Sequence, residues 1–244
     1  MLLELPAATG QALRDLSTET GTSMFMLFQA ATASLLHRLG AGEDIPLGAP
    51  IAGRTDDALG ELVGFFVNTL VLRTDLTGDP TFRELLARVR ESALAAFEHQ
   101  DLPFDQVVEA LNPPRLAGRN PLFQVMLGYH YRPDGDPDVL GMATEWFDMD
   151  TGMAKFDLHF TFVDEAGRDR LVLLLEYAAD LCDEGTAERF AGWLVRLLEG
   201  AVADPDCAVR DVEVLADSER RVVVGEWNAT GRVVEAVTLP ELFN

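Results

Sequence analysis

The sequence of 244 residues contains little cysteine: only Cys182 and Cys207 are present, and they do not form a C-x-x-C pair. None of the histidines is positioned to complete a metal site with them. Disulfide scaffolds and structural zinc sites both need several such ligands at characteristic spacings. The sequence therefore predicts neither a disulfide scaffold nor a bound metal.

Basic residues are also scarce, because 19 Lys and Arg face 41 Asp and Glu and leave a net charge of -22. A field of this sign repels nucleic-acid phosphates and anionic lipid headgroups, so we expect neither nucleic acid nor membrane as a partner. The simplest explanation is a solvated surface that keeps the protein soluble, and a cationic partner is the alternative.

Long apolar runs are absent too. No stretch approaches the roughly 20 apolar residues that a membrane-spanning helix needs. The first residues, Met1 to Pro6, lack the basic start and long apolar core of a secretory signal. We expect a cytoplasmic protein. What the chain does have is 48% hydrophobic residues, enough for a buried core, and a length that suits one large domain or two small ones.

Apolar residues at helical spacing, mostly begun by a capping residue or a proline, predict five helices. They are Thr9–Thr20, Phe25–Leu36, Phe82–Phe97, Phe104–Leu111 and Thr186–Val202. Short runs rich in β-branched and aromatic residues predict five strands, of which the last two form a hairpin. They are Ile45–Ala52, Phe66–Arg73, Leu122–His130, Lys155–Val163 and Arg170–Tyr177. This order predicts an α/β sandwich with a mixed sheet.

Several short strings occur in a fixed order along the chain. G-A-P-I-A-G-R covers 48–54, V-G-F-F-V-N-T covers 63–69, H-Q-D-L-P-F-D covers 99–105, R-N-P-L-F-Q-V covers 119–125 and A-K-F-D-L covers 154–158. Each string alone carries little weight. In this order they resemble the condensation domains of nonribosomal peptide synthetases, and the resemblance extends over nearly the whole chain.

The resemblance implies a chloramphenicol-acetyltransferase-like sandwich lobe, with a mixed sheet flanked by helices. The strings look like the late motifs of the family, which belong to its C-terminal lobe. The family's catalytic His-His-x-x-x-Asp-Gly motif lies upstream of them, so we expect no catalytic residue in this chain. From Gly225 onward, W-N-A-T-G and V-T-L-P-E-L-F resemble the linker into an adenylation domain. We therefore expect one lobe at 1–224 and a linker with the start of the next module at 225–244.

Condensation domains join a carrier-bound acyl thioester to a carrier-bound aminoacyl amine. The implied partners are the N-terminal lobe, peptidyl carrier domains with their phosphopantetheine arms, and the adjacent adenylation domain. The isolated lobe is also a candidate for self-association. A non-catalytic condensation-like module that recruits carriers or tailoring enzymes is the alternative. V-N-T and H-Q-D-L-P-F-D disfavour an epimerisation or heterocyclisation relative.

The first candidate site lies at the end of the strand Ile45–Ala52. The small residues Ala52 and Gly53 let a substrate or a pantetheine arm approach the backbone closely. Arg54 is expected to pair with an acid or to brace the interface with the other lobe. The resemblance implies that this strand end lines the substrate tunnel, whereas the alternative is a turn with a surface arginine.

Asn68 is the second candidate. Along the predicted strand, Phe66, Asn68 and Leu70 face one way, so the amide of Asn68 needs a hydrogen-bond partner if it is buried. Two partners are open to it, neighbouring backbone or a substrate amide.

Further candidates are structural. At 99–105 we expect Asp101 to cap the second helix, Leu102 and Phe104 to fill the core, and His99 to act as a helix-end residue rather than as a catalyst. Arg119 and Asn120 are expected to tie the incoming loop through their side-chain donors. At that motif the family's usual acidic residue and serine are replaced by Leu116 and Gly118.

One string imitates the catalytic motif. H-Y-R-P-D-G, at His130–Gly135, fits its second half, yet it follows the last motif and P-D-G is an ordinary turn signal. We interpret it as a turn. The segment Tyr131–Gly152 is long for a loop in a compact domain, and we expect it to reach toward the other lobe as a latch, with a plain surface excursion as the alternative.

Overall fold

The computed structural model describes residues 1–54, 56–132, 142 and 152–231. The chain divides into two compact units, Met1–Glu213 and Val214–Asn244. In chain order, the larger unit contains β1 (Leu2–Glu4), α1 (Ala7–Thr20), α2 (Met24–Leu36), η1 (His37–Ala41), β2 (Asp44–Ile51), η2 (Asp57–Leu59), β3 (Asn68–Asp75), α3 (Phe82–Glu98), α4 (Phe104–Leu111), β4 (Val125–Tyr131), β5 (Leu158–Glu165), η3 (Ala166–Arg168), β6 (Arg170–Tyr177), α5 (Glu184–Ala203) and η4 (Val209–Asp211).

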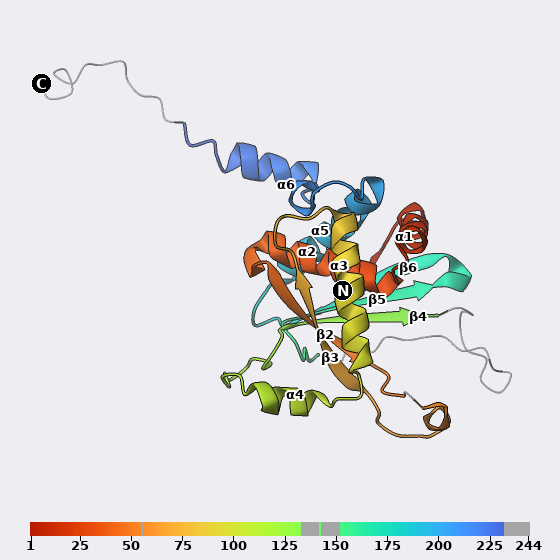
Figure 1. Cartoon of the computed structure of the whole chain (residues 1–244). Coiled ribbons are helices and arrows are strands. Elements are labelled where there is room, and N and C mark those ends of the chain that lie inside the picture. Colours follow the sequence, from red (N-terminus) through yellow and green to blue (C-terminus); the bar gives the residue numbers. More distant parts are fainter. Residues whose placement is uncertain (55, 133–141, 143–151, 232–244) are drawn as a thin grey trace, which may run out of the picture. The chain divides into compact units, whose positions relative to one another are not determined.

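The strands form one six-stranded sheet in the order β1-β6-β5-β4-β2-β3 (Figure 1). β4 lies parallel to both β2 and β5, and the remaining neighbours are antiparallel. The predicted hairpin of β5 and β6 is present, with Leu158 opposite Tyr177. The mixed sheet that the sequence predicts is therefore confirmed.

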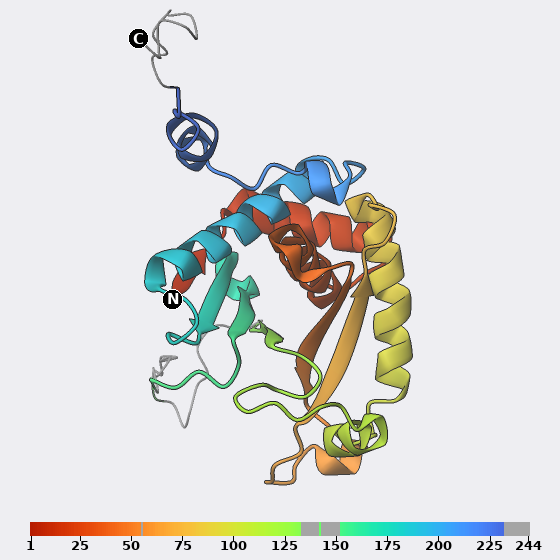
Figure 2. The ribbon, with the colours of Figure 1, turned by 90° about the vertical axis from the view of Figure 1, so that its left-hand side faces the viewer.

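Helices α1, α2, α3 and α5 cover one face of the sheet (Figure 2). Beneath them Phe28 of α2 stacks on Phe162 of β5 with ring centroids 3.8 Å apart, and both rings are buried. Fully burying one such side chain contributes about 1.5–3 kcal/mol. The core thus lies between this helical layer and the sheet, and the opposite face of the sheet, here called the open face, carries none of these four helices.

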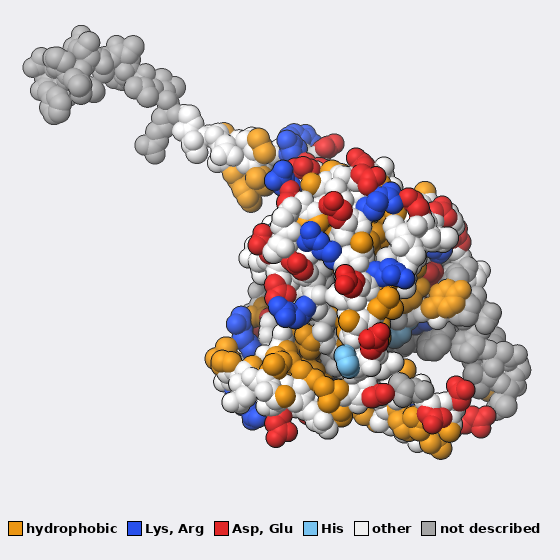
Figure 3. Space-filling view, in the orientation of Figure 1, with side chains coloured by type: hydrophobic (Ala, Val, Ile, Leu, Met, Phe, Trp, Pro, Cys, Tyr) orange, Lys and Arg blue, Asp and Glu red, His pale blue; other side chains and the backbone are white. Residues whose placement is uncertain are grey.

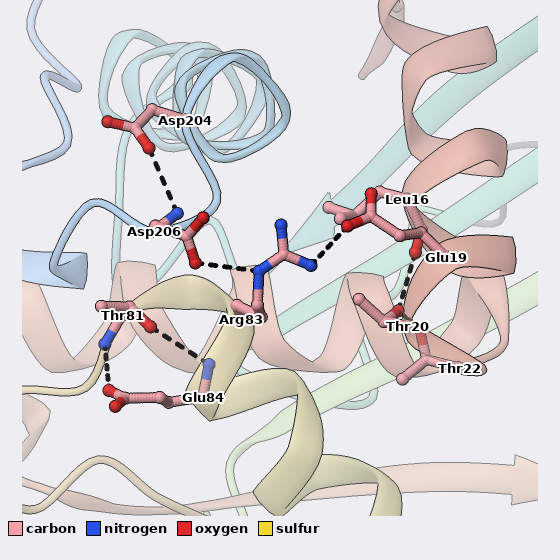
Figure 4. A network of polar contacts seen from close by, with 9 residues as sticks. All are labelled: Leu16, Glu19, Thr20, Thr22, Thr81, Arg83, Glu84, Asp204 and Asp206. Carbon is pink, nitrogen blue, oxygen red and sulfur yellow. Dashed lines mark hydrogen bonds and ion pairs between the residues drawn. The ribbon is translucent and has the colours of Figure 1, made fainter.

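Local signals set the ends of the helices as predicted. Gly21 ends α1 in the left-handed region at φ 63°, a conformation that suits glycine. Ser23 begins α2, because its hydroxyl accepts a hydrogen bond from the backbone N–H of Met26 at 3.2 Å. Thr81 and Glu84 form a reciprocal capping box at the start of α3 (Figure 4).

Arg83 connects segments that are distant in sequence. Its Nη1 lies 2.7 Å from Glu19 Oε1 on α1, and its Nε lies 2.8 Å from Asp206 Oδ1 after α5 (Figure 4). These groups are largely exposed, so the contacts contribute little stability. They link α1, α3 and the segment after α5 at the surface.

The strand predicted at Phe66–Arg73 is shifted, since β3 covers Asn68–Asp75. β2 ends at Ile51, which pairs with Asn68, so the residues before Asn68 have no partner strand. Phe65 is 89% exposed as a result. Apolar and β-branched character alone therefore placed the strand two residues too early. The three residues of β1 were not predicted, because so short a strand has no pattern of its own.

The smaller unit is described only through residue 231. It contains α6 (Asp217–Arg221), continued by the short helix η5 (Val222–Glu226). Most of the predicted linker at 225–244 lies outside the described residues, and the division at residue 224 stays a prediction. No described helix is long and apolar enough to cross a membrane.

Candidate functional site

Asn68 joins two of the sequence motifs. Its Nδ2 donates to the carbonyl oxygens of Gln100 and Leu102, each at 2.9 Å, and its Oδ1 accepts from the N–H of Phe104 at 3.1 Å. A side chain from the string V-G-F-F-V-N-T is thus hydrogen-bonded to the backbone of the string H-Q-D-L-P-F-D. We call Asn68 with the turn 99–104 the motif junction. The sequence left two kinds of partner open for Asn68, neighbouring backbone or a substrate amide, and the contacts in the structure are with backbone. A role for Asn68 in a substrate tunnel stays a prediction.

The junction corrects two expectations. Asp101 is exposed and does not cap α4: Pro103 occupies the cap position without a side-chain bond, and Asn68 takes the Phe104 N–H. Leu102 is 46% exposed and does not fill the core. The sequence suggested a capping residue immediately before α4. The side chain that accepts the Phe104 N–H instead belongs to Asn68, 36 positions before Phe104.

His99 lies at the end of α3, as expected. Its backbone N–H donates to the carbonyl of Ala96 at 3.1 Å, and its side chain is exposed.

The loop after β2 is organised by Gly53 and Arg54. Gly53 has φ +61°, and a Cβ there would lie 1.9 Å from the carbonyl oxygen of Phe66, so only glycine fits. The Arg54 guanidinium donates to the carbonyls of Leu59 and Leu62 and lies 4.4 Å from the centroid of the Phe66 ring. Arg54 therefore braces its own loop. Ala52 is exposed, and the tunnel role of all three motif residues stays a prediction.

Gln124, which sequence reasoning passed over, holds the loop before β4. Its Nε2 donates to the Asn120 carbonyl at 2.7 Å, and its Oε1 accepts from the Asn120 N–H at 3.3 Å. The expected ties from side-chain donors are not what holds this loop. Arg119 is exposed and has no side-chain hydrogen bond to another described residue, and the buried Asn120 Oδ1 has no partner there either.

Aromatic side chains connect three of the motifs across the open face. Ring centroids are 5.7 Å apart for Phe104 and Phe123, 5.6 Å for Phe123 and Phe156, and 6.1 Å for Phe156 and His159. We call these four residues the open-face row. Gly48 lies beneath it, since a Cβ at Gly48 would come within 2.2 Å of the Phe123 ring. The first motif string, G-A-P-I-A-G-R, therefore also meets the row.

His159 ends the row on β5. Its Nε2 lies 3.1 Å from Thr161 Oγ1, and burial lowers the pKa of its imidazole below the ordinary value. Glu176 opposes this decrease, and His130 and Lys155 add to it. His159 belongs to no motif string, so sequence reasoning missed it. Only the alternation of β5 reveals that it faces away from the helices.

A charged cluster lies at the β5–β6 hairpin. Asp164, 2% exposed, accepts from Arg14 Nη2 at 3.0 Å and from the Tyr129 hydroxyl at 3.3 Å, and Arg14 Nη1 also contacts Asp169 at 3.0 Å. We call these four residues the hairpin-end network. Burial, and the neighbouring Asp164 carboxylate, raise the pKa of Tyr129. Tyr129 therefore stays protonated and serves as a hydrogen-bond donor.

The remaining predicted features are only partly visible. His130 is exposed near the end of β4, and Pro133–Gly135 lie outside the described residues, as does most of the predicted latch at Tyr131–Gly152. Among the residues that the structure describes, no group of three or more His, Cys, Asp or Glu is arranged to hold a metal ion. What the described part offers is a braced sheet face that carries one half-buried histidine, whose pKa burial lowers.

A mixed sheet with helices on one face, and motif residues that meet beside it, defines the class: a chloramphenicol-acetyltransferase-like sandwich. Residues 1–224 match the condensation domain family. The chain therefore belongs to the condensation domains of nonribosomal peptide synthetases.

Similar proteins agree with this assignment. A dimodular nonribosomal peptide synthase of Bacillus subtilis (strain 168) is 47% identical over 239 residues, which cover 95% of this chain and 10% of that protein. The X-domain from teicoplanin biosynthesis, in its complex with OxyB, is 34% identical with a TM-score of 0.79, over 89% of this chain and 48% of that one. A four-domain synthetase bound to AMP and glycine shares the fold at 24% identity and a TM-score of 0.80, over 89% of this chain and 18% of that one.

Proposed function

We propose that residues 1–224 are the C-terminal lobe of a condensation domain that forms a peptide bond between a carrier-bound acyl or peptidyl thioester and a carrier-bound aminoacyl amine. One observation carries the proposal: the chain aligns with 48% of the X-domain chain and with 48% of the condensation domain of a polyketide synthase, while most of its own length is matched. The similarity to the synthase of Bacillus subtilis supports the reaction class.

In this proposal the catalytic histidine belongs to the N-terminal lobe. The four histidines of this sequence are well separated, so it holds no His-His pair. An α-amine with a pKa of about 7.7–8.0 is already partly neutral near pH 7, so accurate placement matters more than a strong base. This lobe supplies that placement: Ala52, Gly53 and Arg54 form the tunnel wall, and the open-face row forms the cleft floor.

The proposed partners follow from the reaction. The carrier domains present their substrates on phosphopantetheine arms, the N-terminal lobe completes the cleft, and the segment 225–244 leads into an adenylation domain. We place the reaction in the cytoplasm. Apolar side chains gather over α4 and over the segment before β3 (Figure 3), and Val63, Phe65, Leu111 and Leu116 are exposed there. An isolated lobe with such surfaces is expected to self-associate.

A second candidate is a module that binds a partner protein instead of forming a bond. The observation in its favour is the 34% identity to the X-domain, which was determined in complex with OxyB. The same sheet and the same motif junction suit either activity. The two candidates differ in whether the complete domain forms a dipeptide.

The test compares this chain with the complete two-lobed domain that contains it, each supplied with donor- and acceptor-loaded carriers. We expect dipeptide from the complete domain and none from the chain alone. His130→Ala in the complete domain should leave the rate unchanged, since H-Y-R-P-D-G is interpreted as a turn. Dipeptide formed by the chain alone and lost on His130→Ala contradicts the lobe assignment. A complete domain that forms no dipeptide but retains a partner protein supports the second candidate.

A further inference from the structure

The open face of β5 carries a polar pair that the motifs do not include. His159 and Thr161 alternate with Phe160 and Phe162, which are buried beneath the helices, so the pair faces the opposite side of the sheet. The two side chains lie 3.1 Å apart, from Nε2 to Oγ1, and both are half-buried. The pair is thus held together and is only partly covered by the described residues.

Gly128 on β4 lets this pair lie close against the neighbouring strand. It lies beside Thr161 in the parallel register, and a Cβ there would be 3.2 Å from Thr161 Oγ1 and 3.4 Å from His159 Nε2. Its φ is not in the left-handed region, so the backbone itself does not require glycine. A strand glycine without a conformational reason often marks a place where another group approaches closely.

The chemistry of the pair favours a ligand that carries N–H groups. A threonine hydroxyl bonded to a neutral imidazole keeps at least one free lone pair on Oγ1, which can accept an N–H. Glu176 lies opposite His159 on the neighbouring strand and favours the charged imidazole, whereas the charges of His130 and Lys155 disfavour it. With a net charge of -22, the chain as a whole attracts an amine rather than an anion.

We propose that the half-buried Thr161, beside Gly128, binds the α-amine of the aminoacyl acceptor, and that His159 is a positioning residue that orients the threonine hydroxyl. Thr161 Oγ1 accepts an N–H of the amine and holds it in place for attack on the thioester. Phe156, in edge contact with His159 at 6.1 Å, connects the pair to the open-face row. The assignment rests on the proposed function, because it needs an aminoacyl acceptor.

The test measures dipeptide formation by the complete domain while the acceptor and the donor are varied separately. Thr161→Val removes the hydroxyl, Thr161→Ser keeps it, and Gly128→Ala crowds it with a methyl group 3.2 Å away. Loss of one such hydrogen bond corresponds to about a 3- to 10-fold change. We expect the acceptor KM to rise by that factor in Thr161→Val and Gly128→Ala and to stay near the wild-type value in Thr161→Ser, with the donor KM unchanged throughout.

The control is Gly192→Ala on α5, where a Cβ would lie 3.5 Å from the flexible guanidinium of Arg196, and it should change neither KM. The acceptor site is contradicted if Thr161→Val leaves the acceptor KM within twofold of wild type, or if the donor and acceptor KM rise together. If Gly128→Ala does not fold, the two Thr161 variants decide alone. Dipeptide formation by the wild-type domain is read first and tests the proposed function independently of these variants.

Discussion

The motif junction and the hairpin-end network hold the same sheet by different means. At the junction one uncharged amide makes three hydrogen bonds to backbone, and the row beside it consists of aromatic contacts. At the hairpin a buried carboxylate is held by an arginine and a tyrosine. The motif junction consists entirely of motif residues, and three of the four residues of the open-face row belong to motif strings, whereas none of the second region's four residues does. The motifs therefore mark the region that uncharged contacts hold together, and not the region with the buried carboxylate.

This difference has a physical basis. Arg14 and Asp164 are 150 residues apart and form a contact that any well-placed ion pair could replace. The amide of Asn68 satisfies two carbonyls and one N–H at once, and no other uncharged side chain of that length supplies both donors and an acceptor. The choice of residue is consequently more restricted at the motif junction than in the hairpin-end network.

The largest expected effect comes from Asp164→Ala in the hairpin-end network. The substitution leaves the Arg14 guanidinium and the Tyr129 hydroxyl without their shared partner, and removing one member of a buried pair costs about 3–5 kcal/mol. The lower end of that range applies here, because Arg14 keeps its contact with Asp169. Denaturant unfolding of the chain measures the loss. Asp169→Asn is the control, because it touches the same arginine from an exposed position and should cost under about 0.5 kcal/mol. Equal losses in the two variants would mean that burial does not distinguish these carboxylates.

Asn68→Ala should have the next largest effect, a loss of about 2–3 kcal/mol, because two carbonyls and one N–H lose their partner in a partly buried turn. Asp101→Ala lies in the same junction and should cost under about 0.5 kcal/mol, since Asp101 does not cap α4. Unfolding curves of both variants test the comparison. A larger loss for Asp101→Ala than for Asn68→Ala would restore the cap that the sequence predicted.

Gly48→Ala probes the open-face row itself. The added methyl would meet the Phe123 ring at 2.2 Å, and overpacking of this kind costs about 1–3 kcal/mol, here about 2. Gly10→Ala on α1 is the control, because its nearest neighbours lie 3.8 Å away. Thermal unfolding should show a lower Tm for Gly48→Ala alone. An unchanged Tm would indicate that the row moves aside without cost.

The smallest expected effect is a pH dependence from His159. Because burial lowers the pKa of its imidazole, the unfolded chain binds the proton first as the pH falls below about 6.5, and the folded state then loses stability. His159→Gln should remove this part of the loss between pH 7 and pH 5. Unfolding free energies of the two proteins over that range check the prediction, and parallel pH profiles would contradict it.

Much of the fold could be predicted from local signals. Gly21, Ser23 and Thr81 each set a helix end through contacts within a few residues, and two β-rich runs joined by a short connection with A-G-R at its centre were sufficient to predict the hairpin. The start of β3 could not be predicted, because it depends on where β2 turns away at Gly53. Strand pairing depends on both strands, so the composition of one segment does not predict where its pairing begins.

The candidate site was less accessible to sequence reasoning for the same reason. The string H-Q-D-L-P-F-D indicated a helix junction, but the capping partner of Phe104 lies in another motif. His159 and Thr161 became visible only once β4 and β5 were paired in register and the helical layer was assigned to one face. Residues that act through tertiary neighbours leave no spacing pattern in a single sequence.

The most direct test of the central claim, that the motif residues brace this fold, is amide hydrogen exchange at Phe104. Its N–H donates to Asn68 Oδ1 at 3.1 Å, whereas the first N–H of a helix otherwise has no partner within the helix. We predict that this amide is protected in the wild-type chain and exchanges much faster in Asn68→Ala, while the Leu85 amide in α3 keeps its protection. Equal exchange of the Phe104 amide in the two proteins would contradict the account.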